Sequence, residues 1–208
     1  MDFTAALSAW QQGQSEQALA IWQQLAEQGD IRAQYNLGVI LDHGERVQRN
    51  PELAAQYYRM AAEQGYSDAA LNLAIMMDEG DCTEDHHSNR VRWYVLAAQQ
   101  GNPQAQFKIG WFYDKGEHLA KDEDQAAKWY FSAADQGHPE ACNNLARCFA
   151  MGEGVERNDI QAYKWFNIAA ELGVANAGKY RERVAKELSP EQRLQAGDLS
   201  QQWLKHHR

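Results

Sequence analysis

The chain has 208 residues, of which 44% are hydrophobic and 24% are charged, values that are ordinary for a soluble globular protein. Its formal net charge of −9 argues against a nucleic-acid partner, because proteins that bind a phosphate backbone usually present a basic face. The first residues, MDFTAALSAWQQG, lack the pattern of a secretory signal, and no later segment approaches the length of a membrane span. We therefore expect a cytoplasmic protein, or a periplasmic one if a signal was trimmed from this chain.

A 36-residue repeat runs through the chain and predicts its fold. Three columns keep this period: Gly29, Gly65, Gly101, Gly137 and Gly173; Ala33, Ala69, Ala105, Ala141 and Ala177; and the aromatics Trp22, Tyr58, Tyr94, Tyr130 and Phe166. One helical pair cannot bury its apolar stripe alone, so successive pairs must stack. The sequence therefore predicts an all-α solenoid of helix-turn-helix repeats.

We predict that residues 1–208 form a single domain with distinct ends. Residues 1–30 are expected to form an N-terminal cap pair, residues 31–174 four full repeats, and residues 175–208 the C-terminal capping helices. In the first full repeat, one helix over about 31–43 ends at Gly44. A second helix over about 50–64 begins with Asn50 as its cap and Pro51 in its first turn.

The closing segment is expected to cover the last repeat. Ser189-Pro190-Glu191-Gln192 predicts a capping box that opens the final helix, and Gly197-Asp198 predicts a break in that helix. Four apolar side chains are expected to pack on the preceding repeat: Leu194, Leu199, Trp203 and Leu204.

The stretch GDCTEDHHSNR, residues 80–90, has the residue types of a metal site. Cys82, Asp85, His86 and His87 could be drawn as a zinc cluster, since Cys and His are good zinc ligands. However, adjacent histidines project in different directions, and the loops at 44–54, 116–126 and 152–162 have the same length. We therefore predict an inter-helix loop without metal, and keep a metal-responsive binding module as an alternative function.

The segment ACNNLARCFAMGEGVERNDIQAYKWFNIAAELG, residues 141–173, resembles the Sel-one-like repeat, a relative of the tetratricopeptide repeat. Residues 33–65 resemble it too. The resemblance implies a right-handed α/α superhelix that serves as a protein-interaction scaffold, with no shared catalytic residues. Some bacterial members carry a disulfide in each repeat. This chain has only three cysteines, which favours a reducing compartment and leaves an envelope or secreted interaction factor as an alternative.

Catalysis has no support in the motifs of the chain. The sequence contains no GxSxG, P-loop or HExxH pattern. Cys148 occupies a column that Ile40 and Met76 fill in earlier repeats, so we predict a packed thiol rather than a nucleophile. We expect a protein without enzymatic activity and without a cofactor.

The first helices of the repeats are expected to line a concave groove that binds a protein or peptide. The predicted partner-binding residues are Tyr35, Asn36, Val39, Leu71, Asn72, Ile75, Phe107, Lys108, Trp111, Asn144 and Arg147. Amides both donate and accept hydrogen bonds, Lys108 and Arg147 supply positive charge, and tryptophan and arginine dominate many interfaces. An alternative for the asparagines is that they bond a neighbouring repeat.

Overall fold

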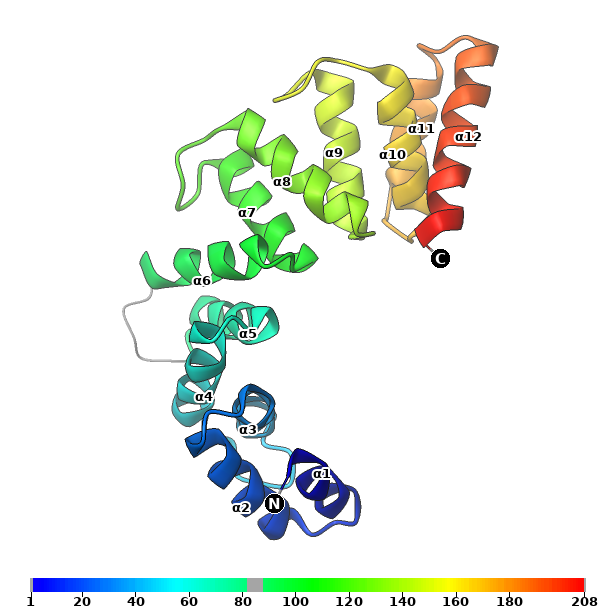
Figure 1. The fold of residues 1–208 in the computed structure, drawn as a ribbon. Coiled ribbons are helices and arrows are strands. Elements are labelled where there is room, and N and C mark those ends of the chain that lie inside the picture. Colours follow the sequence, from blue (N-terminus) through cyan, green and yellow to red (C-terminus); the bar gives the residue numbers. More distant parts are fainter. Residues whose placement is uncertain (1, 82–87, 208) are drawn as a thin grey trace. The chain divides into compact units, whose positions relative to one another are not determined.

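The computed structural model describes residues 2–81 and 88–207. Within these residues every regular element is an α-helix, which confirms the all-α prediction (Figure 1). The helices are α1 Phe3–Gln11, α2 Ser15–Glu27, α3 Ile31–His43, α4 Pro51–Glu63, α5 Ser67–Glu79, α6 Ser88–Gln99, α7 Pro103–Lys115, α8 Glu123–Asp135, α9 Pro139–Met151, α10 Asp159–Glu171, α11 Ala177–Ala185 and α12 Pro190–His207. None of those in the described ranges is long and apolar enough to cross a membrane.

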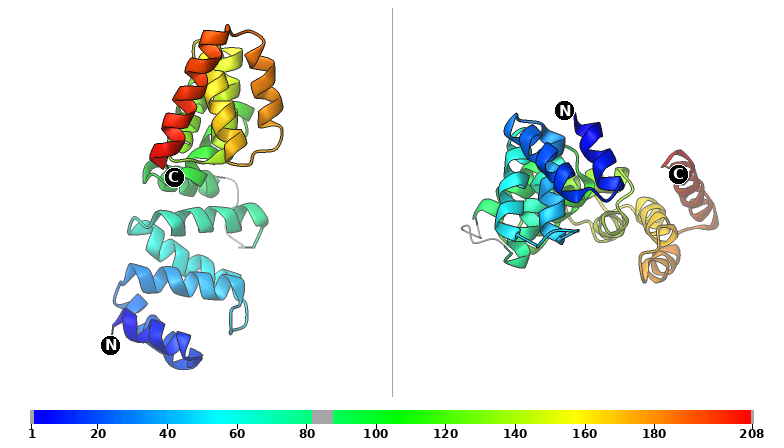
Figure 2. Two further views of the ribbon diagram at one scale, coloured as in Figure 1. Left: turned by 90° about the vertical axis from the view of Figure 1, so that its right-hand side faces the viewer. Right: turned by 90° about the horizontal axis from the view of Figure 1, so that it is seen from below.

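The helices fall into two compact units, Met1–Gly101 with α1–α6 and Asn102–Arg208 with α7–α12. In each unit a helix packs mainly against its successor, both within a pair, as α3 does on α4 and α7 on α8, and between pairs, as α8 does on α9. At the end of the second unit α10 contacts both α11 and α12 (Figures 1 and 2). The single domain over 1–208 stays a prediction.

The helix ends follow from local chemistry. The side chain of Asn50 accepts a hydrogen bond of 3.1 Å from the Leu53 amide, and Pro51 opens α4, as predicted. Helix α3 ends at Gly44, whose φ of +68° lies in the left-handed region that glycine adopts without a steric penalty. The predicted helices at 31–43 and 50–64 therefore match α3 and α4 to within one residue.

The core is built from the columns of the repeat. Ala33, Ala105 and Ala141 are 0% exposed, and so are the rings of Tyr58 and Tyr130. A Cβ atom at Gly110 would lie 2.8 Å from Cδ1 of Tyr130, so the absent side chain makes room for the tyrosine ring. Small residues on one helix thus let aromatic residues of the next helix fill the interior.

The C-terminal segment agrees with the sequence at its start and differs in its interior. Ser189 and Gln192 form the predicted capping box, because the Ser189 amide donates to Gln192 Oε1 and the Gln192 amide donates to Ser189 Oγ. The predicted break at Gly197-Asp198 is wrong, since α12 is continuous from Pro190 to His207. The Ser200 hydroxyl donates to the Gly197 carbonyl and accepts from Asn167 of α10, which holds the helix across the glycine.

Fewer residues of α12 pack on the preceding repeat than the sequence predicts. Trp203 and Leu204 are 8% and 4% exposed and pack with Trp165 and its neighbours. Leu194 is 68% exposed, so its predicted packing is wrong. It belongs to the first turns of α12, whereas the buried residues of this helix begin at Ala196.

His138 caps α9 in a way that depends on its protonation. Its Nδ1 accepts a hydrogen bond of 3.3 Å from the Ala141 amide, and its ring stacks on Phe107 at 4.6 Å. Burial lowers the pKa of His138 more than the nearby Glu140 carboxylate raises it. Only the neutral imidazole offers Nδ1 as an acceptor, so protonation removes the cap.

We expect His138 to make the second unit less stable in mild acid. The unfolded histidine takes up a proton near pH 6.5, whereas the folded one does so only at lower pH, so stability falls as the pH drops through this window. In His138→Asn the amide takes over the cap, as Asn102 does for α7. Urea unfolding between about pH 7.5 and 5 should show a steeper loss for the wild type than for the variant. Equal slopes would contradict this role.

Candidate functional site

In the first unit two of the predicted binding residues, Tyr35 and Leu71, take part in the packing of the repeats. Tyr35 on α3 places its ring 4.7 Å from that of Tyr66 and 5.9 Å from that of Tyr58. Asn72 on α5 is half-buried. Leu71 is only 6% exposed and offers little surface. The three remaining predicted residues of this unit are half-buried: Asn36, Val39 and Ile75.

In the second unit α7 carries the predicted aromatic and cationic residues. Phe107 is occupied by its stacking on His138 and by the ring of Tyr130, 5.9 Å away. Lys108 and Trp111 are half-buried, and the Lys108 ammonium lies 5.4 Å from the centroid of the Trp111 ring. This distance is that of a cation–π contact, so the two side chains form one amphipathic patch on α7.

A tyrosine–aspartate pair recurs with the period of the repeat and was not predicted. The Tyr94 hydroxyl donates to Asp78 at 2.9 Å, and the Tyr130 hydroxyl donates to Asp114 at 3.3 Å. Burial and the neighbouring carboxylate raise the pKa of both tyrosines well above the ordinary value, so both keep their protons. The signal in the sequence is an aspartate two residues before the glycine that ends the first helix of a repeat, which holds for Asp42, Asp78 and Asp114.

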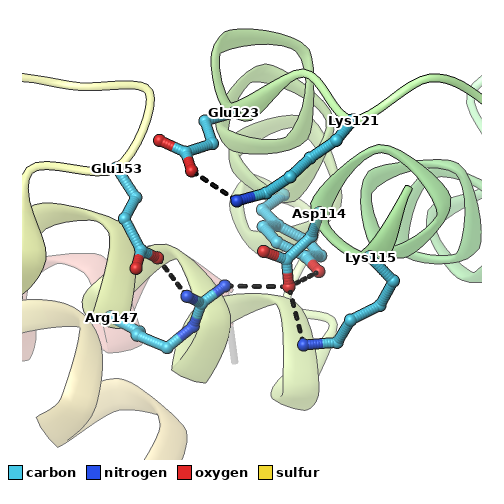
Figure 3. A network of polar contacts seen from close by, with 7 residues as sticks. Asp114, Lys115, Lys121, Glu123, Arg147 and Glu153 are labelled. Atoms are coloured by element: carbon cyan, nitrogen blue, oxygen red, sulfur yellow. Dashed lines mark hydrogen bonds and ion pairs between the residues drawn. The ribbon is translucent and has the colours of Figure 1, made fainter.

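Arg147 joins α9 to α7 through this aspartate (Figure 3). One guanidinium nitrogen lies 2.9 Å from Asp114 Oδ2, and another pairs with Glu153. Burial alone would raise the pKa of Asp114, but the charges and hydrogen bonds of Arg147 and Lys115 outweigh it and lower that pKa. Arg147 is therefore largely a link between repeats. Asn144 beside it is half-buried.

The residue pattern of α7 and α9 continues on α11, beyond the last predicted repeat. Tyr180 stands 36 residues after Asn144, and Arg183 stands 36 after Arg147. The Tyr180 ring is 42% exposed and stacks on Phe166 at 5.6 Å. The Arg183 guanidinium lies 5.6 Å from the centroid of that tyrosine. Extending the period into 175–208 would have found both residues.

We name this row of half-buried and exposed side chains the first-helix face of the second unit. It consists of Lys108 and Trp111 on α7, Asn144 and Arg147 on α9, and Tyr180 and Arg183 on α11. A cavity of about 370 Å³ opens between α9, α10 and α11, and Arg147, Tyr180 and Arg183 line it. The face thus combines three cations with two aromatic rings in a protein whose net charge is −9.

The two cysteines in the described residues are packed in the core of the second unit. Cys142 and Cys148 are buried free thiols, and burial raises the pKa of these thiols to about 12 and about 11. Such thiols are protonated at neutral pH and pack as small apolar groups, as predicted for Cys148. The zinc cluster drawn at Cys82, Asp85, His86 and His87 lies outside the described residues.

Solved structures of known proteins resemble this chain in fold and in sequence. A Sel1 repeat protein from Oxalobacter formigenes has 26% identity and a TM-score of 0.80, over 97% of this chain and 85% of that one. A protective antigen of uropathogenic Escherichia coli strains with an SLR fold has 32% identity and a TM-score of 0.60, over 91% of this chain and 48% of that one. The chain therefore spans about half the length of that antigen. No curated protein gave a match.

The family model agrees with these structural relatives. The Sel1 repeat model matches residues 12–30, 31–66, 67–102, 103–138 and 139–174, in register with the 36-residue period. Most of the chain is covered by these matches. The chain therefore belongs to the Sel1 repeat family, whose repeats generally serve as protein–protein interaction scaffolds.

Proposed function

We propose that this protein is a non-enzymatic adaptor that binds a protein partner on the first-helix face of its second unit. The observation that carries the proposal is the row of matched side chains on α7, α9 and α11, in which Lys108, Arg147 and Arg183 accompany Trp111 and Tyr180. Tryptophan, tyrosine and arginine are the residue types that most often dominate interface energies. Arg147 is already paired with Asp114 and Glu153, so Lys108 and Arg183 are the cations of the row that favour an acidic partner segment.

The concave groove along the whole chain stays a prediction. In the first unit Tyr35 packs on the rings of Tyr58 and Tyr66 and Leu71 is buried, so the described contacts support the second unit more strongly. Within the second unit Trp111 and Lys108 are better targets than Arg147. Replacing Arg147 would also break its ion pair with Asp114 and so disturb the packing of the repeats.

The proposal predicts that a Trp111→Ala, Lys108→Glu variant loses its protein partners. The change removes the aromatic surface and reverses the adjacent charge. Immobilised full-length protein is exposed to a lysate of the native organism, and the retained proteins are quantified by mass spectrometry. Since a central tryptophan often contributes about 2 kcal/mol or more, specific partners should fall at least about tenfold.

Phe131→Ala supplies the matched control. Phe131 is an aromatic residue of the same unit that is 50% exposed, but it lies on the second helix α8 and not on the first-helix face. Proteins retained by the wild type and by Phe131→Ala, and lost from the double variant, support the proposal. If the double variant retains the same set as the wild type, the face is not the binding surface.

A further inference from the structure

The last repeat lacks the tyrosine–aspartate pair of the two repeats before it. Phe166 stands where the pair has Tyr130, and Ala150 stands where it has Asp114. Both changes remove polar atoms from the same place, since Phe166 and Ala150 line the cavity between α9, α10 and α11. The position that is filled by a hydrogen-bonded pair in the preceding repeat is an apolar hollow here.

The size and walls of this cavity suit a large side chain. Its volume of about 370 Å³ lies within the usual range of roughly 300–1,000 Å³ for ligand-binding clefts. Phe166 and Val184 are buried beneath it, whereas Met151 is 69% exposed and Tyr180 42% exposed. An exposed methionine beside stacked aromatic rings is an adaptable apolar surface.

Ala150 also leaves Arg183 without the carboxylate that its counterpart has. Arg147, 36 residues earlier, is paired with Asp114, and the residue equivalent to Asp114 opposite Arg183 is Ala150. Among the described residues, no carboxylate lies within ion-pairing distance of Arg183, which contacts the Tyr180 ring instead. A guanidinium presents several donors that match a carboxylate.

The other two cations at the rim, Arg147 and Arg157, are paired within the chain. Arg157 donates two hydrogen bonds of 3.1 Å to Asp159, and Glu187 adds to the negative charge near Arg157. Glu153 pairs with Arg147. Arg183 is therefore the rim cation that a ligand carboxylate can reach without displacing an existing ion pair.

We infer that this cavity receives a large apolar side chain of the partner, next to an aspartate or glutamate side chain of the same segment that pairs with Arg183. In the preceding repeat the Asp114 carboxylate pairs with Arg147 and the Tyr130 side chain fills the equivalent position. In the last repeat the acidic and the apolar side chain of the partner segment would take these two places. This inference rests on the proposed function and names the chemistry of the partner segment. Apolar burial supplies the affinity, and the ion pair fixes the orientation of the segment.

The test restores the missing pair within the chain. Ala150→Asp with Phe166→Tyr introduces the two residues that the preceding repeat already accommodates, so the fold should tolerate them. The introduced carboxylate would neutralise Arg183 and make the hollow polar. The probe is a library of random peptides displayed on phage by their C-terminal ends, so that a carboxylate has to come from an Asp or Glu side chain. Full-length protein is the target.

The wild type should enrich peptides that place Phe, Trp, Leu or Met beside Asp or Glu. A fluorescein-labelled peptide from this pool should bind the restored-pair variant at least about tenfold more weakly in fluorescence polarisation, a difference of about 1.4 kcal/mol. Replacing the apolar or the acidic residue of the peptide by alanine should have a similar effect. Phe131→Ala should bind like the wild type, and thermal unfolding should show that each variant is folded.

The outcomes separate this inference from the proposed function. If binding survives Ala150→Asp with Phe166→Tyr but is lost in Trp111→Ala, Lys108→Glu, the cavity is not the binding site of the peptide. The proposal that the first-helix face binds the partner then still stands. Binding that is insensitive to both double variants counts against both. A selection that yields no peptides, or peptides without an acidic residue beside a large apolar one, also overturns the inference.

Discussion

Gly154→Ala is expected to be the most destabilising single substitution of those considered for the second unit, with a loss above about 3 kcal/mol. A Cβ atom at this position would overlap the carbonyl oxygen and carbon of Glu123 in the preceding repeat. Backbone atoms cannot move aside as a flexible side chain can, so the loop and α8 would have to separate. Urea unfolding of the full chain measures the loss.

Gly152→Ala is the matched control for this effect. Gly152 has a φ of +74° and Gly154 a φ of +67°, so both replacements carry the penalty of a left-handed backbone. An added Cβ at Gly152 would meet its nearest atom at 3.6 Å, an ordinary contact. We therefore expect a loss of only about 1 kcal/mol there. Equal losses for the two variants would show that backbone conformation, and not the contact with Glu123, makes Gly154 necessary.

His118 also indicates that the contact with Glu123, and not the backbone conformation, requires glycine at position 154. It stands 36 residues before Gly154 and has a φ of +63° while it carries a full side chain. The left-handed conformation at this position is therefore accessible to a residue other than glycine. The close approach of Glu123 is what distinguishes Gly154.

Asp114→Ala is expected to cost about 2 kcal/mol, the second-largest effect. The substitution removes one partner of the half-buried Arg147 and the acceptor of the Tyr130 hydroxyl. The cost should be smaller than that of breaking a fully buried pair, because Arg147 keeps Glu153 and its side chain is 33% exposed. Denaturant unfolding of the wild type and of Asp114→Ala at neutral pH measures this loss.

A double-mutant cycle with Arg147→Met separates these contributions. Methionine keeps much of the arginine stem without the charge, so the combined variant should recover part of the stability lost in Asp114→Ala. The lowered pKa of Asp114 adds a second readout. Its contribution is complete above the unfolded pKa of about 4 and is lost as the pH falls through the folded value. Strict additivity in the cycle would contradict the link.

The repeat and its helices could be predicted from the sequence because they depend on local chemistry. Asn50, Pro51 and Gly44 fix the ends of α3 and α4 without reference to distant residues. The columns of alanine and aromatic residues mark the buried face of each helix. Gly197 shows the limit of this reasoning, because hydrogen bonds through Ser200 to α10 override its weak helix propensity.

The candidate site could be predicted only in part. Lys108, Trp111 and Arg147 were identified by their column, but the period does not say which partner each side chain finds within the chain. The pairing of Arg147 with Asp114, and the stacking of Phe107 on His138, depend on side-chain directions across two repeats. The cavity arises from the absence of a pair at Ala150 and Phe166, which gains meaning only once the pair at Asp114 and Tyr130 is known.

The central claim is that the first-helix face of the second unit binds the protein partner. Isothermal titration of a partner recovered by capture, against the wild type, Phe131→Ala and the Trp111→Ala, Lys108→Glu variant, tests it most directly. We predict the same Kd for the first two proteins and a Kd at least about tenfold higher for the third, since at least about 1.4 kcal/mol of interface energy is removed. A Kd for the double variant equal to that of the wild type would contradict the claim.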